Sequence, residues 1–184
     1  MPKHNTTPIP TYNENRIMKT YVITLSQKFP AKHPRKGEPT NFNNQLLNAV
    51  WRSHNMSVGF PQFGMKLHTI RANYPLWKKR FEQIEAGKAI LSVRYWTGKP
   101  YHSKQMEICK LSAKDGIGIQ KFEVWANYAG INNWQHFKID DHGYMSINDI
   151  PNKDGLSRED WINWFKNYDL TKPMAIIHFT NYRY

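Results

Sequence analysis

Residues 64–71 gather an amine, an imidazole, a hydroxyl and a guanidinium into one short stretch, Gly-Met-Lys-Leu-His-Thr-Ile-Arg. Thr69 and Arg71 are two residues apart, so they face the same side if the stretch forms a strand. On a regular strand, Lys66 and His68 face the opposite side. Lys66 can join Thr69 only if a turn or bulge interrupts the strand near its start, and the glycine that opens the stretch favours one.

Amide hydrolysis is a reaction that these side chains suit. It needs a nucleophile, a base that takes the proton of the nucleophile, and a group that protonates the leaving amine. Thr69 offers a hydroxyl, and Lys66 is a base only where burial and a cationic neighbour such as Arg71 lower its pKa toward neutrality. In the structural alternative, Lys66 is solvated. Arg71 then pairs with an acid at the edge of the core, Glu107 or Glu123.

The same stretch resembles the signature of the ASCH domain family, Gly-x-Lys-x-x-Glu-x-Arg, with Gly64, Lys66 and Arg71 in register. Thr69 replaces the glutamate, as it does in the subgroup of small bacterial amidohydrolases that deacetylate N4-acetylcytidine. The resemblance implies that Lys66 and Thr69 are catalytic, together with an acid just before the last helix, where Asp154 is the best match. It also implies an α+β fold, a small PUA-like mixed β-barrel decorated with two or three helices.

A second candidate feature is the stretch 94–104, in which cationic and aromatic side chains interleave around a turn. Aromatic faces stack on bases at roughly 1–3 kcal/mol each, and Lys or Arg side chains bind phosphate. The alternative is a solvated hairpin with its aromatic side chains packed beneath it. The predicted ligand-binding residues are Arg71 and His68 from the first stretch, and Arg94, Trp96, Lys99, Tyr101 and Lys104 from this one.

Hydrophobic runs and turn signals predict the elements that must position these residues. Runs rich in β-branched and aromatic residues predict strands at 20–25, 67–71, 89–96, 105–111, 117–125 and 174–180. Helical spacing predicts helices at 43–52, 75–86 and 156–168. We assign the aromatic stripe of the last helix to the hydrophobic core.

The length of 184 residues suits one domain with additions. We expect a flexible tail at 1–17 and a single ASCH/PUA-like domain at 18–184, with insertions at about 27–63 and 126–153. The N-terminus lacks the apolar region of a signal peptide, and no apolar run is long enough to span a membrane. We therefore expect a cytoplasmic protein without a membrane partner.

Composition points to polyanionic partners. Lys and Arg total 26 against 14 acidic residues, a formal net charge of +12, and aromatic residues make up 14 % of the chain. The single cysteine, Cys109, excludes an internal disulfide and a multi-cysteine zinc site. The histidines lack metal-binding spacing, so we expect no metal and no other cofactor.

These observations favour RNA, a nucleotide or a modified nucleoside as the partner. The first hypothesis is an enzyme, a hydrolase that acts on an acylated nucleoside such as N4-acetylcytidine or on RNA as a ribonuclease. The alternative is a non-catalytic RNA- or nucleotide-binding module that uses the same cleft. The third hypothesis is a scaffold protein whose positive charge binds a protein partner.

Overall fold

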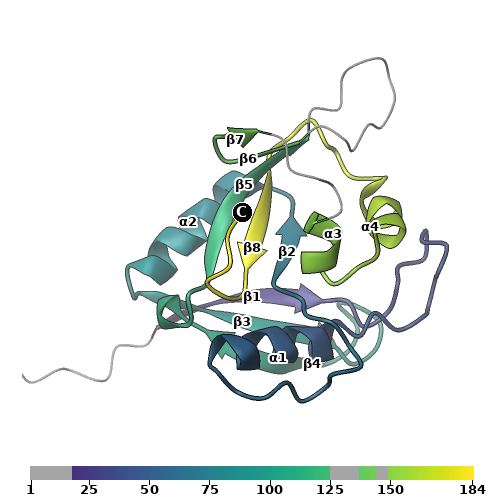
Figure 1. Cartoon of the computed structure of the whole chain (residues 1–184), viewed down its shortest axis with the longest axis horizontal. Helices are drawn as coiled ribbons and strands as arrows, with labels where there is room; N and C mark the ends of the chain where they lie inside the picture. The colour runs from purple at the N-terminus through teal and green to yellow at the C-terminus, as the bar shows by residue number, and fades with distance from the viewer. Residues whose placement is uncertain (1–17, 125–136, 144–148) are drawn as a thin grey trace, which may run out of the picture.

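The computed structural model describes residues 18–124, 137–143 and 149–184. They form a mixed α+β structure with two β-sheets and helices around them (Figure 1). The tail predicted at 1–17 and most of the insertion predicted at 126–153 lie outside the described residues.

The smaller sheet has the strand order β1-β3-β4. β1 (Lys19–Leu25) runs parallel to β3 (Ala89–Trp96), and β4 (Gln105–Leu111) returns antiparallel to β3. Leu91 and Val93 of β3 are fully buried, as the strand period of two predicts. The turn between β3 and β4 closes one side of the pocket described below.

The larger sheet has the strand order β2-β8-β5-β6-β7 and is antiparallel throughout. Its strand β8 reads Met-Ala-Ile-Ile-His and is buried over its whole length, because it lies between two strands and α2 packs on it. A continuous apolar run of this kind is typical of a strand that is covered on both faces. The strand bounds are β2 His68–Arg71, β5 Gly118–Val124, β6 Phe137–Ile139, β7 His142–Gly143 and β8 Met174–His178.

The helices begin and end at local signals. α2 has a proline in its first turn, and the Asn73 side chain accepts a hydrogen bond from the backbone N–H of Leu76 at 3.2 Å. At the start of α4, the Ser157 hydroxyl accepts one from the backbone N–H of Asp160 at 3.1 Å. The helix bounds are α1 Phe42–Ser53, α2 Tyr74–Glu85, α3 Asp149–Lys153 and α4 Arg158–Phe165, with a 3-10 turn at Ala113–Asp115.

The helices divide into two groups around the sheets (Figure 1). α2 packs against β3, β5 and β8, and buries Trp77, Phe81 and Ile84 there. In Figure 1, α3 lies beside β2 and α4 lies beyond α3. The segment just before β2 is hydrogen-bonded to α1 and α3, which come from distant parts of the chain.

The structure confirms the α+β class and corrects its finer description. No pairing among the described strands joins the two sheets, so they do not form the closed barrel that we expected. Each predicted strand and helix is present, with small changes at its ends. The prediction missed α3, β6 and β7, because these elements are short and lie in a polar stretch with little periodicity.

Within residues 18–124, 137–143 and 149–184, no helix has the length and the hydrophobicity that crossing a bilayer requires.

Candidate active site

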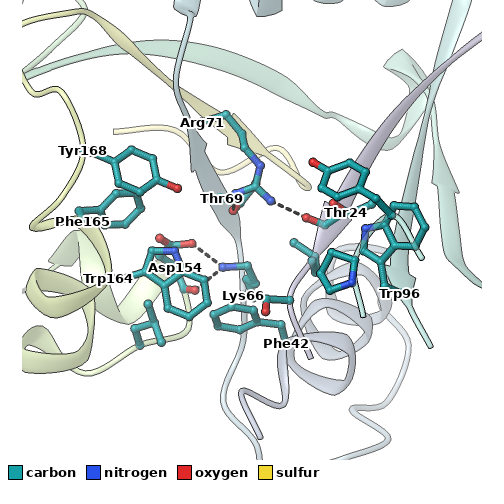
Figure 2. A pocket seen from close by; sticks show the side chains of 15 residues that line it. Thr24, Phe42, Lys66, Thr69, Arg71, Trp96, Asp154, Trp164, Phe165 and Tyr168 are labelled. Atoms are coloured by element: carbon teal, nitrogen blue, oxygen red, sulfur yellow. Dashed lines mark hydrogen bonds and ion pairs between the residues drawn. The ribbon is translucent and has the colours of Figure 1, made fainter. Parts of the chain in front are cut away.

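A pocket of about 180 Å³ is lined by residues from both sheets and from α1 and α4 (Figure 2). Six of the residues singled out in the sequence for catalysis or ligand binding line it together: Trp96, Tyr101, Lys66, Thr69, Arg71 and Asp154. The last of these is far from the others along the chain, so only folding brings it to the motif.

Lys66 and Asp154 form a buried ion pair. Nζ of Lys66 donates to Oδ1 and to the backbone carbonyl of Asp154, and the two side chains are 1 % and 3 % exposed. Nε1 of Trp161 donates to Oδ2 of the same carboxylate at 3.1 Å. The ring centroid of Phe42 lies 4.0 Å from Nζ, which adds a cation–π contact. Two of the three N–H groups of the ammonium thus go to Asp154, and the third remains for the ring or for an acceptor in the pocket.

Lys66 reaches the Thr69 side because it lies before the strand. β2 begins at His68, so strand alternation does not apply to Lys66. The backbone N–H of Lys66 donates to the carbonyl of Gln45 in α1 at 3.0 Å. The next N–H, of Leu67, donates to a carbonyl at the end of α3 at 2.8 Å. α1 and α3 thus stabilise the irregular backbone before β2, which allows Lys66 to lie on the same side as Thr69.

Asn48 of α1 fastens the loop that leads into this segment. It is fully buried, and its Nδ2 donates to the carbonyls of Phe60, Phe63 and Gly64 at 2.8, 2.9 and 3.1 Å. Its Oδ1 accepts from the N–H of Phe60 at 3.1 Å. A Cβ atom on Gly64 would meet nothing within 4 Å, so the conformation comes from these bonds and not from a need for glycine.

Burial shifts both members of the ion pair toward their neutral forms. Desolvation lowers the pKa of Lys66, against the attraction of Asp154, and the nearby Arg71 lowers it further. Desolvation raises the pKa of Asp154, against the opposing effect of Lys66. Because one pKa falls and the other rises, moving the proton from Nζ to the carboxylate costs less than it does in water. The pKa of Lys66 is thus shifted in the direction that a base requires.

The Thr69 hydroxyl lies beside this pair and is held by Arg71. The Thr69 residue is 4 % exposed, and its Oγ1 accepts a hydrogen bond from Nη1 of Arg71 at 3.2 Å. The Arg71 guanidinium also donates to the backbone carbonyl of Thr24 at 2.6 Å, across to the smaller sheet. The structural alternative for Arg71 is wrong, because Glu107 and Glu123 pair with other cations.

Aromatic side chains form two walls of the pocket (Figure 2). On one side, the ring of Trp96 lies against that of Tyr101, with centroids 5.3 Å apart. The other wall comes from α4 and the turn after it, and consists of Trp164, Phe165 and Tyr168. Aromatic rings on two sides of the polar groups of Lys66, Thr69 and Arg71 suit a flat ligand with a polar edge.

The structure confirms the assignment of this aromatic stripe to the core for Trp161 and Phe165, and corrects it for Tyr168. Trp161 and Phe165 are buried, but Trp164 is only half-buried and Tyr168 is 38 % exposed. Periodicity indicates which side chains face the body of the protein, but not whether they meet packed atoms or a cavity. The two tryptophans of so short a helix, with Tyr168 just after it, were the available signal.

His68 does not reach the pocket. It is fully buried on the side of β2 away from Thr69, as strand alternation predicts. Its Nε2 lies 2.7 Å from the Tyr184 hydroxyl, and its ring lies edge-on to that of His178. Burial lowers its pKa well below the usual value, with His178 adding to the effect. His68 is therefore a neutral group of the interior and not a ligand contact.

Three predicted cations of the β3–β4 hairpin also lie away from the pocket lining. Arg94 donates to the Ser92 hydroxyl at 2.8 Å and lies 3.8 Å from the Glu107 carboxylate, so it is used within the sheet. Lys99 and Lys104 are exposed around the turn. Only the aromatic members of the hairpin prediction, Trp96 and Tyr101, line the pocket.

In the part of the chain that the structure describes, no three His, Cys, Asp or Glu side chains are grouped to hold a metal ion. Comparison of the chain with protein-family models, with curated proteins and with solved structures finds no match. The geometry of the pocket and the resemblance at residues 64–71 are therefore what bears on its chemistry.

Proposed function

We propose that the chain is an amidohydrolase of the ASCH type that acts on an acylated nucleoside, such as N4-acetylcytidine, free or within RNA. The observation that carries the proposal is the buried Lys66–Asp154 pair beside the Thr69 hydroxyl, inside a pocket with aromatic walls. The match of residues 64–71 to the family signature supports the same reaction. In this proposal, the two sheets correspond to an opened form of the PUA-like barrel.

The size and the walls of the pocket favour a single base as the group that enters. Its volume of about 180 Å³ is below the range of roughly 300–1,000 Å³ that is usual for small-molecule sites. Stacking on aromatic walls accepts the faces of a base, while the polar groups of the pocket meet its edge. An exocyclic acylamide on that edge would face Lys66, Thr69 and Arg71.

In the proposed first step, the Thr69 hydroxyl attacks the carbonyl carbon of the amide. The neutral amine of Lys66, formed when Asp154 takes its proton, accepts the proton of the hydroxyl. Arg71 stays cationic and stabilises the negative charge that develops on the carbonyl oxygen. The C–N bond then breaks, and the protonated Lys66 returns the proton to the leaving exocyclic amine.

The second step releases the acyl group. After the amine leaves, the acyl group remains on Thr69 as an ester. A water molecule attacks this ester with Lys66 again as the base, which releases a carboxylic acid and restores the hydroxyl. The sum is one amide and one water converted into one amine and one acid.

One observation favours the non-catalytic binding module as a second candidate. The hydrogen bonds of Nζ of Lys66 go to Asp154, and the Thr69 hydroxyl accepts its bond from Arg71 and not from Lys66. In the binding module, the same polar groups would recognise the edge of a base without cleaving it.

The test is incubation of the purified protein with N4-acetylcytidine and a panel of acylated nucleosides, with products followed by liquid chromatography. Thr69→Val removes the hydroxyl and keeps the shape. Thr180→Val is the matched control, because Thr180 is also buried, at 3 % exposed, but does not line the pocket. We expect free nucleoside from the wild type and from Thr180→Val, and a rate at least about a hundredfold lower in Thr69→Val.

Two results would contradict the proposal. Equal rates in Thr69→Val and in the wild type would exclude the hydroxyl as the nucleophile. Release from no member of the panel, while the same nucleosides bind, would establish the binding module instead.

A further inference from the structure

A second hollow lies on the far side of the wall that α4 contributes to the pocket. Trp164 and Tyr168 line both the pocket and this hollow, which has a volume of about 320 Å³. The rest of its lining comes from residues 30–33 and from Asn163 and Asn167. The two hollows are thus neighbours that share an aromatic ridge.

The loop that forms one side of this hollow is anchored on α4. Nη1 of Arg35 donates to Oδ2 of Asp160 at 2.7 Å, and the ring Nε2 of His33 lies 3.0 Å from the Asp160 carbonyl oxygen. The ring centroids of Phe29 and Trp164 are 5.8 Å apart, in an edge-to-face arrangement. The loop therefore packs against the helix, so this side of the hollow is formed before any ligand binds.

The lining of the second hollow suits an anion attached to a flat group. Lys32 is exposed and brings a positive charge, and the exposed Asn167 brings an amide group. The amide of Asn163 is hydrogen-bonded to the Glu159 carbonyl and to Lys166. No Asp or Glu is among the described residues that line this hollow. The whole chain has a formal net charge of +12, so its field also favours a polyanion.

We propose that this second hollow binds the nucleotide next to the one whose base enters the pocket, so that single-stranded RNA binds more tightly than a free nucleoside does. The proposal rests on the proposed function for the identity of the group in the pocket, a nucleobase. The pocket accommodates one base, and the ridge of Trp164 and Tyr168 separates that base from its neighbour. Lys32 contacts a phosphate of the strand.

RNA is favoured over DNA because of an amide in the lining of the second hollow. Asn167 is exposed and has both a donor and an acceptor in its side chain. A ribose 2′-hydroxyl is also both a donor and an acceptor, and it is the group by which a protein distinguishes RNA from DNA.

The experiment compares calorimetric titrations of unmodified cytidine monophosphate, a short oligocytidylate RNA and the matching DNA. This experiment measures binding alone, so it does not require the protein to hydrolyse any ligand. Lys32→Ala removes the cation of the hollow, and Lys36→Ala is the matched control, because Lys36 is an exposed lysine of the same loop that lines neither hollow. We expect the RNA to bind more tightly than the mononucleotide and the DNA. Lys32→Ala should weaken RNA binding by about tenfold and leave the mononucleotide unchanged, and it should lower the salt slope of the binding constant by about 0.7.

Equal affinity for the RNA and the mononucleotide would overturn the second subsite, and so would equal losses in Lys32→Ala and Lys36→Ala. Equal affinity for RNA and DNA would overturn the assignment to RNA. These outcomes are separate from the hydrolysis assay: if RNA binds as expected but an acylated nucleoside is cleaved neither free nor within the oligonucleotide, the hydrolase proposal fails and the subsite stands.

Discussion

Breaking the Lys66–Asp154 pair is the sharpest test of how this site is built. Lys66→Met keeps most of the side-chain volume but leaves the Asp154 carboxylate buried without its cation, with the Trp161 N–H as a remaining partner. Removing one member of a buried ion pair costs roughly 3–5 kcal/mol, because the other charge remains desolvated. We expect a loss of that size in the free energy of unfolding, measured by urea denaturation with tryptophan fluorescence at neutral pH.

The same variant should be less destabilised in acid. Without Lys66, burial raises the pKa of Asp154 further above its value in the unfolded chain, so the folded state keeps a proton that the unfolded state releases. The stability lost at neutral pH is therefore partly regained as the pH falls through the folded-state pKa. Repeating the denaturation at about pH 5 tests this sign.

Two further variants separate electrostatics from packing. The double variant Lys66→Met/Asp154→Leu removes both charges and should recover most of the loss, because a buried apolar pair is often as stable as an ion pair. Lys110→Met is the surface control: its Nζ lies 3.7 Å from Glu107 and its side chain is 59 % exposed, so the loss should be below about 1 kcal/mol. A double variant as unstable as Lys66→Met at both pH values would refute the reasoning, because packing would then account for the loss.

Three more predictions concern polar groups that are buried or half-buried. Asn48→Ala removes four hydrogen bonds to residues 60–64, so amide hydrogen exchange there should accelerate and stability should fall by roughly 1–3 kcal/mol. Burial raises the pKa of Cys109 to about 12, so iodoacetamide should label it slowly at neutral pH and faster only as the pH approaches that value. Burial lowers the pKa of His178 to about 3, so the unfolded chain binds a proton below about pH 6.5 that the folded chain excludes. Stability should fall as the pH drops through this window, and His178→Leu should make the fall in the urea midpoint shallower.

Patterns among neighbouring residues predicted most of the helices and strands. The strands predicted at 89–96 and 105–111 have those bounds in the structure, because alternation and a tight turn are properties of neighbouring residues. The sequence around Ser157 likewise indicates that this residue caps the N-terminus of α4. The short elements between residues 137 and 153 were not, since runs of two to five residues have too little periodicity to detect.

The sequence by itself determined which motif side chains share a face. Thr69 and Arg71 lie together and His68 lies away from them, because side chains alternate along any strand. It also determined the types of group available for chemistry, a hydroxyl, an amine and a guanidinium, within one short stretch.

Only the tertiary structure decided what surrounds those groups. The partner of Lys66 lies 88 positions along the chain, and α1 and α3 hold the backbone that aims the amine at the pocket. The wall from α4 and the anchored loop beside it likewise depend on how separate elements pack. No local pattern encodes such contacts, because they form only where the burial of one element against another brings distant side chains together.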